Sequence, residues 1–108
     1  MSFSMNTPAP SPAPGPESYA AQAKPLVLVV EDEAAIATML RYNLEKSGFR
    51  VDEAADGQEA VTRIAETQPD LVLLDWMLPV MSGIEVCRQI RRRPATRELP
   101  VIMVTART

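Results

Sequence analysis

Short strand-like segments alternate along this chain with longer segments whose apolar residues recur every three to four positions. The strand-like segments are 26–30, 49–54, 71–74 and 100–104. Continuous apolar runs are typical of strands buried on both faces, and the wider spacing is typical of helices with one packed side. Such alternation favours a parallel sheet covered by helices on both faces, so the sequence predicts an α/β fold in the order βαβαβαβ.

The three segments between the strands are expected to be amphipathic helices. Asp56 and Ser82 each precede an apolar stripe, and each is followed three positions later by a glutamate, Glu59 or Glu85, which is the pattern of a capping box. Glycine or proline then ends each helix. The inward-facing residues are expected to be Ile36, Met39, Leu40 and Leu44; Ala60, Val61, Ile64 and Ala65; and Ile84, Cys87 and Ile90.

The strands differ in how apolar they are. Segments 26–30, 71–74 and 100–104 are apolar throughout and are expected to be buried, with 71–74 in the centre of the sheet. Segment 49–54 alternates between apolar and charged residues, as an edge strand does. Residues 1–24 are rich in proline, alanine and serine, so we expect a disordered or polyproline-like tail before a single domain at 25–108. The tail could be a ligand for a proline-binding module, or a passive extension if Met5 is the true start.

Composition excludes several kinds of chemistry. The chain has no histidine and a single cysteine, Cys87, so the common zinc sites and the Cys/His and Ser/His catalytic arrangements are absent. A net charge of -3 argues against sequence-independent binding of nucleic acid. No apolar stretch is long enough to cross a membrane and the first residues do not resemble a signal peptide, so we predict a cytoplasmic protein.

Carboxylates and a hydroxyl follow three of the predicted strands. Glu31 and Asp32 follow the first strand, Asp75 the third and Thr105 the fourth. Reactive groups collect at the carboxyl edge of a parallel sheet, where these side chains can meet. A hard divalent cation such as Mg²⁺ would relieve the repulsion among three carboxylates. A carboxylate beside such a cation can act as a nucleophile toward phosphorus, giving an aspartyl phosphate.

Simpler interpretations exist for each of these features. The carboxylates could be helix caps or strand ends in water, and Trp76 and Met77, which could suggest a ligand pocket, are expected to pack under the next loop. A run of arginines could be a phosphate or DNA surface, but we expect it to be solvated near a helix C-terminus. These arginines are Arg88, Arg91, Arg92, Arg93 and Arg97.

Together, four motifs resemble the receiver domain of bacterial two-component response regulators, in its OmpR/PhoB branch. The motifs are Val-Val-Glu-Asp-Glu at 29–33, Leu-Leu-Asp-Trp-Met-Leu-Pro at 73–79, Ser-Gly at 82–83 and Val-Thr-Ala-Arg at 104–107. The resemblance covers 25–108 and implies a flavodoxin-like (CheY-like) parallel sheet in the strand order 2-1-3-4.

The resemblance also implies a role for each site residue. Asp75 corresponds to the phosphoacceptor, Asp32 to a direct Mg²⁺ ligand and Glu31 to a residue that acts on the metal, directly or through water. The backbone carbonyl of Met77 would complete the protein's share of the coordination. Thr105 corresponds to the switch hydroxyl, and the amide of Ala106 would hold phosphoryl oxygens.

The implied function is signalling rather than enzymatic turnover. A sensor histidine kinase would phosphorylate Asp75, and the change would control transcription in a phosphate response through an output domain that binds DNA. An alternative is an aspartate-nucleophile phosphatase of the haloacid dehalogenase type. That class carries a second aspartate two positions after the nucleophile, where this chain has Met77.

The sequence departs from the family pattern after its fourth strand. The family's fourth helix, fifth strand and fifth helix are not present, nor are the dimerisation face, the output domain and the lysine that contacts the phosphoryl group. The only lysines, Lys24 and Lys46, are expected at the opposite edge of the sheet. We therefore expect a truncated receiver with an open edge strand and a tendency to form a non-native oligomer. An interaction-only fragment that binds a kinase without sustaining a signal is a second alternative.

Overall fold

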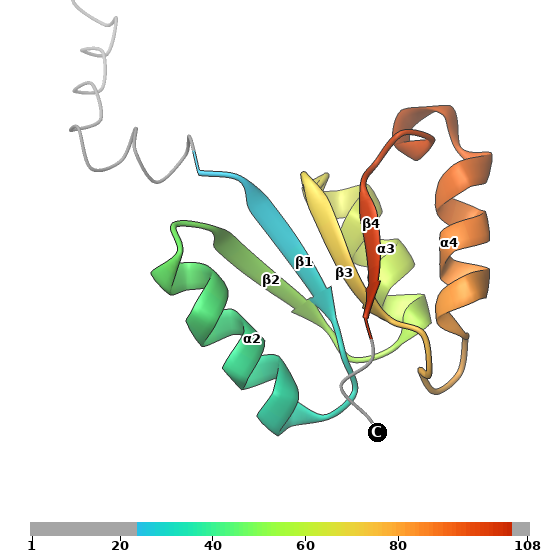
Figure 1. Cartoon of the computed structure of the whole chain (residues 1–108). Coiled ribbons are helices and arrows are strands. Elements are labelled where there is room, and N and C mark those ends of the chain that lie inside the picture. Colours follow the sequence, from blue (N-terminus) through green and yellow to red (C-terminus); the bar gives the residue numbers. More distant parts are fainter. Residues whose placement is uncertain (1–23, 105–108) are drawn as a thin grey trace, which may run out of the picture.

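The computed structural model describes residues 24–104. Strands and helices alternate along this part of the chain as the apolar pattern predicts (Figure 1). In chain order they are β1 (Leu26–Val30), α2 (Ala34–Lys46), β2 (Arg50–Ala54), α3 (Gly57–Thr67), β3 (Leu71–Asp75), α4 (Gly83–Arg92), the short 3-10 helix η1 (Pro94–Thr96) and β4 (Val101–Val104). The predicted order βαβαβαβ is therefore confirmed, with η1 as an addition.

The four strands form one parallel sheet in the order β2-β1-β3-β4. The order 2-1-3-4 and the central position of β3 are both confirmed. Strand β2 lies at an edge, as its alternating sequence predicts. Charged side chains on β2 form ion pairs with both neighbouring helices, Glu53 with Arg41 of α2 and Asp52 with Arg63 of α3. Charged side chains on an edge strand disfavour its pairing with another chain.

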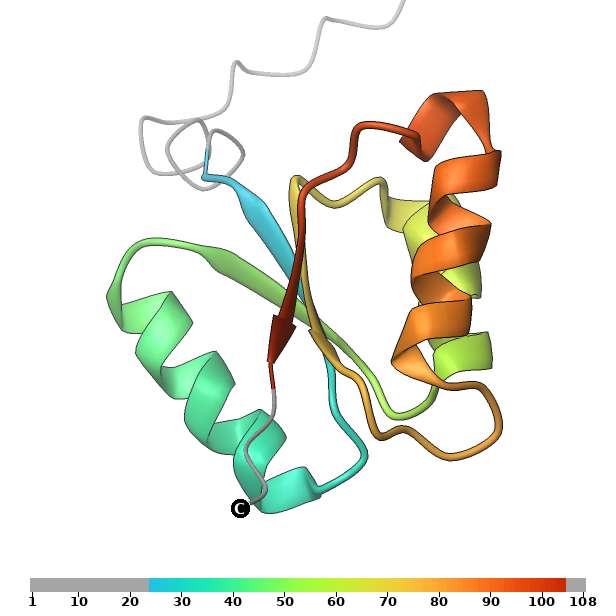
Figure 2. The same cartoon turned by 45° about the vertical axis from the view of Figure 1, so that its right-hand side comes forward.

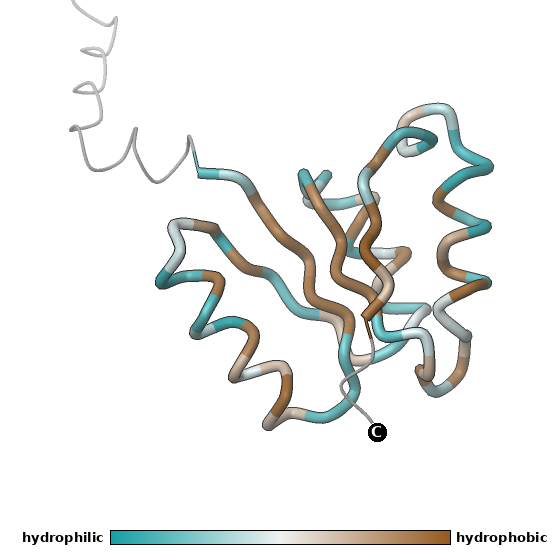
Figure 3. The backbone as a smooth tube through the Cα atoms, viewed as in Figure 1, coloured by the Kyte–Doolittle hydropathy of each residue, from teal (hydrophilic) through white to brown (hydrophobic). Residues whose placement is uncertain are grey.

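Helices cover the two faces of the sheet unequally. Helix α2 lies on one face, and α3 and α4 lie side by side on the other (Figures 1 and 2). The main apolar core is on the α3 and α4 face, where alternate strand residues meet the helices. It comprises Leu28, Val30, Ala54, Ala60, Ile64, Val72, Leu74, Val86 and Ile90. The most hydrophobic stretches of the tube in Figure 3 accordingly follow the inner strands β1 and β3.

Three predicted inward-facing residues are in fact exposed: Met39, Ala65 and Ile84. On α4 the buried residues are Gly83, Val86 and Ile90, so the packed side is rotated from the one that Ile84, Cys87 and Ile90 would define. The amide of Gly83 donates a hydrogen bond to the carbonyl of Trp76, which helps to fix this rotation. Ala37 is the only buried residue of α2.

Strand β4 is less buried than its apolar sequence predicts. Ile102 and Met103 remain 49% and 41% exposed. Within residues 24–104, β4 has a strand neighbour on one side only, which is β3. The prediction of a buried fourth strand is therefore wrong for these two positions, because a second neighbour would be needed to cover them.

None of the described helices is both long enough and apolar enough to cross a membrane.

Candidate metal centre

Two neighbouring strands carry the predicted carboxylates to one edge of the sheet. In the parallel pairing of β1 with β3, Val30 is the partner of Leu74. Glu31 and Asp75, the next residues, therefore come beside each other, with Asp32 immediately after. The carboxyl ends of β1, β3 and β4 all lie at the lower edge of the sheet in Figures 1 and 2.

The three carboxylates form one compact group. One carboxylate oxygen from each of Glu31, Asp32 and Asp75 lies within 4.8 Å of the others. Asp75 is fully buried and Glu31 is 5% exposed, whereas Asp32 is open to solvent. Like charges held this closely, two of them away from water, repel one another, so the predicted cluster is present and is electrostatically unfavourable on its own.

Local hydrogen bonds orient the two buried carboxylates. Oδ1 of Asp75 accepts a hydrogen bond from the amide of Met77 at 3.0 Å, and Oε2 of Glu31 accepts one from the amide of Glu33, also at 3.0 Å. Each side chain thus binds the backbone two residues further along, where its loop leaves the strand. The same hydrogen bonds therefore shape the loops after β1 and β3 and orient the carboxylates of Glu31 and Asp75.

Glu31 titrates abnormally because of this environment. Burial is the largest influence and raises the pKa of the Glu31 carboxyl above its ordinary value. The nearby carboxylates of Asp32 and Asp75 raise the pKa further, while the hydrogen bond from Glu33 opposes the change. A bound cation would act in the opposite direction, because it stabilises the ionised carboxylate.

The donor set suits a hard divalent cation. Mg²⁺ binds one or a few carboxylates, prefers oxygen ligands and retains several water molecules. Glu31, Asp32 and Asp75 supply oxygen donors only, and the exposure of Asp32 leaves the group accessible to water. The residues present therefore fit such an ion, which would also offset the repulsion among them.

Gly83 is a site residue whose packing role the sequence did not reveal. A β-carbon at Gly83 would lie 2.6 Å from Cα of Trp76 and 2.8 Å from the carbonyl oxygen of Asp75. Only glycine lets the start of α4 approach the acidic loop this closely. The Ser-Gly pair in the sequence marked a helix start, but the close approach depends on tertiary structure.

The loop that follows Asp75 carries exposed apolar side chains. Trp76 and Met77 are about half exposed, so the expectation that they pack under the next loop is wrong. Val80, in the same loop, is almost fully exposed and has a positive φ of 70°. The acidic group is therefore bordered by a loop with accessible apolar surface.

The remaining predicted site residues can be placed only in part. Thr105 and Ala106 lie outside the described residues, but Val104, directly before them, is the strand partner of Asp75. Lys24 precedes β1 and Lys46 ends α2, so both lysines lie at the opposite edge of the sheet from the carboxylates, as predicted.

Comparison with known proteins identifies the class of this domain. Residues 27–108 match the family described as the response regulator receiver domain. The chain belongs to that family, and this favours the receiver interpretation over a phosphatase of the haloacid dehalogenase type.

The relatives include regulators of phosphate genes. The chain is 58% identical over 83 residues to the phosphate regulon transcriptional regulatory protein PhoB of Rhizobium meliloti, covering 77% of this chain and 37% of that protein. It is 51% identical over 81 residues to PhoB of Escherichia coli, covering 75% and 35%. The chain therefore spans little more than a third of the length of these curated relatives.

Solved receiver structures have the same fold. The receiver domain of the sensor histidine kinase PA1611 of Pseudomonas aeruginosa, with magnesium coordinated in its active site cleft, matches with a TM-score of 0.74 and 36% identity, covering 78% of this chain and 69% of that one. The chemotaxis response regulator CheY4 of Vibrio cholerae matches with a TM-score of 0.75 and 31% identity, covering 80% and 72%.

Proposed function

We propose that this chain is a phosphoacceptor module in which Asp75 receives a phosphoryl group while Glu31, Asp32 and the backbone carbonyl of Met77 hold Mg²⁺. One observation carries the proposal: a fully buried aspartate lies in a group of three carboxylates whose oxygens are within 4.8 Å of one another. The magnesium-bound receiver domain among the similar structures supports it.

The chemistry divides between the ion and the protein. When bound, Mg²⁺ neutralises charge on the transferring phosphoryl group. The Asp75 carboxylate attacks phosphorus, so that a new P–O bond forms while the bond from phosphorus to the donor breaks. The chain itself contains no histidine, so a phosphohistidine donor must come from a partner protein. We propose that this partner is a sensor histidine kinase.

We further propose roles for the two residues that follow β4. Val104 pairs with Asp75, so the sequence continues from the acidic edge into Thr105 and Ala106. The Thr105 hydroxyl would donate a hydrogen bond to a phosphoryl oxygen and the Ala106 amide would donate to another. Through these two hydrogen bonds, the segment after β4 would change its contacts when Asp75 is phosphorylated.

The relatives support a proposal about the wider role of the domain. Regulators of phosphate genes share about half of their aligned residues with this chain. We propose that the domain acts in a phosphate response and that transcription is controlled by an output domain of the kind that accounts for the rest of the relatives' length. DNA contact would then belong to that output domain rather than to residues 25–108.

A second candidate function, binding of a kinase without a lasting phosphorylated state, rests on the positions of the two lysines. Both lie at the edge of the sheet far from Asp75, so neither can contact a phosphoryl group there. The chain could then bind a kinase through α2 without maintaining a phosphorylated state. The lifetime of the phosphorylated form separates the candidates, when compared with that of a version extended by a lysine-bearing fifth strand.

The experiment for the main proposal is phosphorylation by a small acyl phosphate with Mg²⁺, followed by intact-mass measurement. We expect a gain of one phosphoryl group in the unmodified chain, no gain in Asp75→Asn and no gain when the metal is chelated. Asp70→Asn, at the opposite edge of the sheet, is the matched control and should be phosphorylated normally. A gain that persists in Asp75→Asn would refute the assignment of Asp75.

A further inference from the structure

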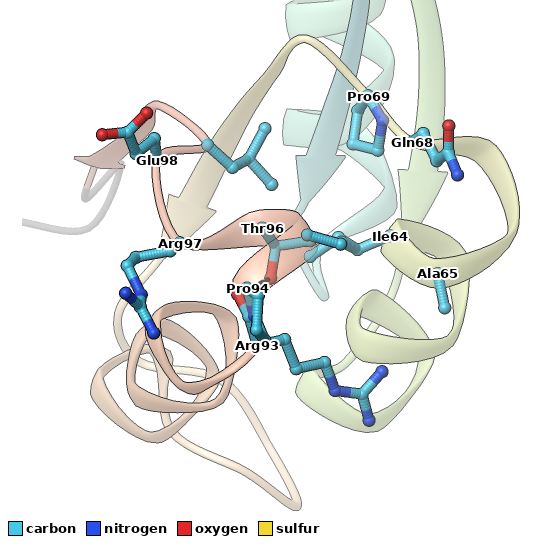
Figure 4. Close-up of a pocket in the computed structure, with 11 residues that line it drawn as sticks. Ile64, Ala65, Gln68, Pro69, Arg93, Pro94, Thr96, Arg97 and Glu98 are labelled. Atoms are coloured by element: carbon cyan, nitrogen blue, oxygen red, sulfur yellow. Dashed lines mark hydrogen bonds between the residues drawn. The ribbon is translucent and has the colours of Figure 1, made fainter.

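The segment that joins α4 to β4 has little packing on one of its sides. Residues 93–99 border a hollow of about 780 Å³, whose opposite wall is the end of α3 and the turn after it (Figure 4). Leu99 packs partly against the core. Figure 4 shows the guanidinium groups of Arg93 and Arg97 directed to different sides, away from the apolar lining of the hollow. Contacts with α4 are therefore important for the position of this segment.

One side chain of α4 binds three backbone carbonyl groups of the segment. Nη1 of Arg91 donates to the carbonyl oxygens of Leu99 at 2.6 Å and Arg97 at 3.0 Å, and more weakly to that of Thr96 at 3.5 Å. The Thr96 hydroxyl donates to the carbonyl of Ile90 at 2.6 Å. Hydrogen bonds from a charged donor are stronger than those from a neutral one, so Arg91 is the main tie between the segment and α4.

The other arginines of α4 have different partners. Arg88 and Arg92 form ion pairs with Glu85. Among the described residues, neither of these two arginines donates a hydrogen bond to the segment 93–99. Arg91 and Arg92 both lie in the last turn of α4, so they interact alike with the helix dipole. Arg92 is therefore a matched comparison for Arg91.

The position of the segment decides where β4 begins. The carbonyl of Pro100 accepts a hydrogen bond from the amide of Val72 at 3.0 Å, at the start of the pairing between β3 and β4. Within residues 24–104, β3 is the only strand that pairs with β4. The register then makes Val104 the partner of Asp75. A displaced start of β4 would therefore move the residues after Val104 relative to Asp75.

The sequence of β4 does not fix this register by itself. Residues 101–104 are all apolar, so a slip by one residue would exchange one apolar side chain for another on each face of the strand. The register then depends on the geometry of the connection that leads into the strand. In this protein that connection is the segment bound by Arg91.

We propose that Arg91 is a positioning residue: its guanidinium group fixes the start of β4 against α4, and so sets where Thr105 lies relative to Asp75. The part about β4 concerns the fold alone, whereas the part about Thr105 rests on the proposed phosphorylation of Asp75. Arg91 lies in the last turn of α4, and the first turn is the one that approaches the acidic loop. Arg91 therefore acts through β4 and not by contact with the metal or the phosphoryl group.

Hydrogen exchange of backbone amides in the full chain tests the position of β4. The amide of Val72 bonds to Pro100, whereas the amide of Asp70, on the same strand side of the sheet, bonds to Leu26 at 2.8 Å. Arg91→Gln should lower the protection of the Val72 amide at least about tenfold and change that of Asp70 much less, because only β4 loosens. Arg92→Gln should leave both amides as they are in the unmodified chain.

A second variant covers the case in which Arg91→Gln does not fold, which circular dichroism would reveal. Thr96→Val removes the hydroxyl that bonds to Ile90 and should also lower the protection of Val72 more than that of Asp70. Equal losses at the two amides, or unchanged protection of Val72, would overturn the proposal. So would an equal effect of Arg91→Gln and Arg92→Gln.

Phosphorylation by a small acyl phosphate tests the consequence for the site. At saturating Mg²⁺, Arg91→Gln should lower the rate of phosphorylation at least about threefold, because the groups after β4 are misplaced. Its dissociation constant for Mg²⁺ should be unchanged, because Glu31, Asp32 and Asp75 belong to β1, β3 and the loop after β1. A parallel loss of Mg²⁺ affinity, or an unchanged rate, would overturn the positioning role. If the unmodified chain gains no phosphoryl group, the proposed function fails, and hydrogen exchange alone decides whether Arg91 positions β4.

Discussion

Asp75 combines two properties that conflict in a protein without a cation. Its side chain is fully buried, and it is a member of a group of three carboxylates. Buried ionised groups require compensation by hydrogen bonds or opposite charge, and the amide of Met77 supplies part of it. The residue that we propose as the phosphoacceptor therefore lies where a negative charge lowers the stability of the fold.

Glu31 allows this destabilisation to be measured. Its pKa is raised above the ordinary value of 4.5, so the native state keeps a proton at pH values where the unfolded chain has lost it. The native state is then favoured at low pH, and the free energy of unfolding contributed by Glu31 falls as pH rises from 4.5 through the native pKa. We expect Glu31→Gln to remove this fall in the metal-free protein, as measured by urea unfolding across that pH range.

Two comparisons sharpen the measurement. Glu66→Gln, at an exposed position on α3, should leave the pH dependence unchanged. Saturating Mg²⁺ should stabilise the unmodified chain above the native pKa of Glu31 and stabilise Glu31→Gln less, because a ligand that binds only the native state raises the free energy of unfolding. A pH profile that is the same in Glu31→Gln and the unmodified chain would contradict the role of this carboxyl.

Gly83 gives a second prediction for a single residue. A methyl group there would collide with the backbone of Asp75 and Trp76, so Gly83→Ala should destabilise the protein by about 1 to 3 kcal/mol, as overpacking does. It should also weaken Mg²⁺ binding, because relief of the collision moves the backbone of Asp75. Urea unfolding and metal titration measure the two effects.

Gly48 provides the matched control for Gly83. A β-carbon at Gly48 would have no neighbour within 4 Å, but its φ of 97° makes alanine strained. Gly48→Ala should therefore destabilise the chain by about 1 kcal/mol without changing metal affinity, because the position is far from the carboxylates. Equal Mg²⁺ affinity in both alanine variants would show that Gly83 serves packing alone.

At the level of elements, the caps of α3 and α4 could be predicted from the sequence. Oδ1 of Asp56 accepts a hydrogen bond from the amide of Glu59 at 2.8 Å, and Oγ of Ser82 accepts one from the amide of Glu85 at 3.2 Å. Capping depends on residues three positions apart, so it is visible in a local pattern. Both helices consequently begin where the sequence predicts.

The Asp56 cap can be tested directly. Asp56→Ala removes the acceptor for the Glu59 amide and should lower the free energy of unfolding by about 1 kcal/mol. Gln58→Ala, in the first turn of the same helix, should change it by less than about 0.5 kcal/mol. Urea unfolding at neutral pH compares the two variants, and an equal loss in both would mean that the cap contributes little.

The inward faces of the helices could be predicted less well than their ends. The sequence assigns Ile84 to the core, but the close approach of Gly83 to the β3 loop turns Val86 inward and leaves Ile84 48% exposed. The spacing of apolar residues identifies a helix, whereas its rotation depends on a contact with a distant segment. Ala65 on α3, which was also expected in the core, is likewise exposed.

For the whole molecule, the predictions that succeeded rest on topology. Parallel strands joined by helices place all their carboxyl ends at one edge, so the meeting of Glu31, Asp32 and Asp75 could be expected before any coordinates. The open edge at β4 was expected only from the resemblance to the receiver family. The apolar pattern of 101–104 by itself predicts a buried strand, because it does not distinguish a covered strand from an open one.

The edge at β4 therefore combines two features that promote association. Within residues 24–104, one side of β4 has no strand neighbour, and Ile102 and Met103 are about half exposed. A neighbouring hollow of about 510 Å³ between α4 and β4, lined in part by Ile84, Cys87 and Met103, adds apolar surface. Strand edges with accessible apolar side chains pair readily with other chains.

We accordingly expect the 108-residue chain to associate as its concentration rises, and Ile102→Lys to oppose this, because a charged side chain on an edge strand disfavours pairing. Sedimentation velocity over a hundredfold range of concentration measures the effect.

Gln58→Lys, which adds the same charge at an exposed position on α3, is the control and should associate like the unmodified chain. If both lysine variants become monomeric to the same extent, net charge rather than the β4 edge governs association. If the unmodified chain is a monomer over the whole concentration range, the β4 edge does not promote self-association.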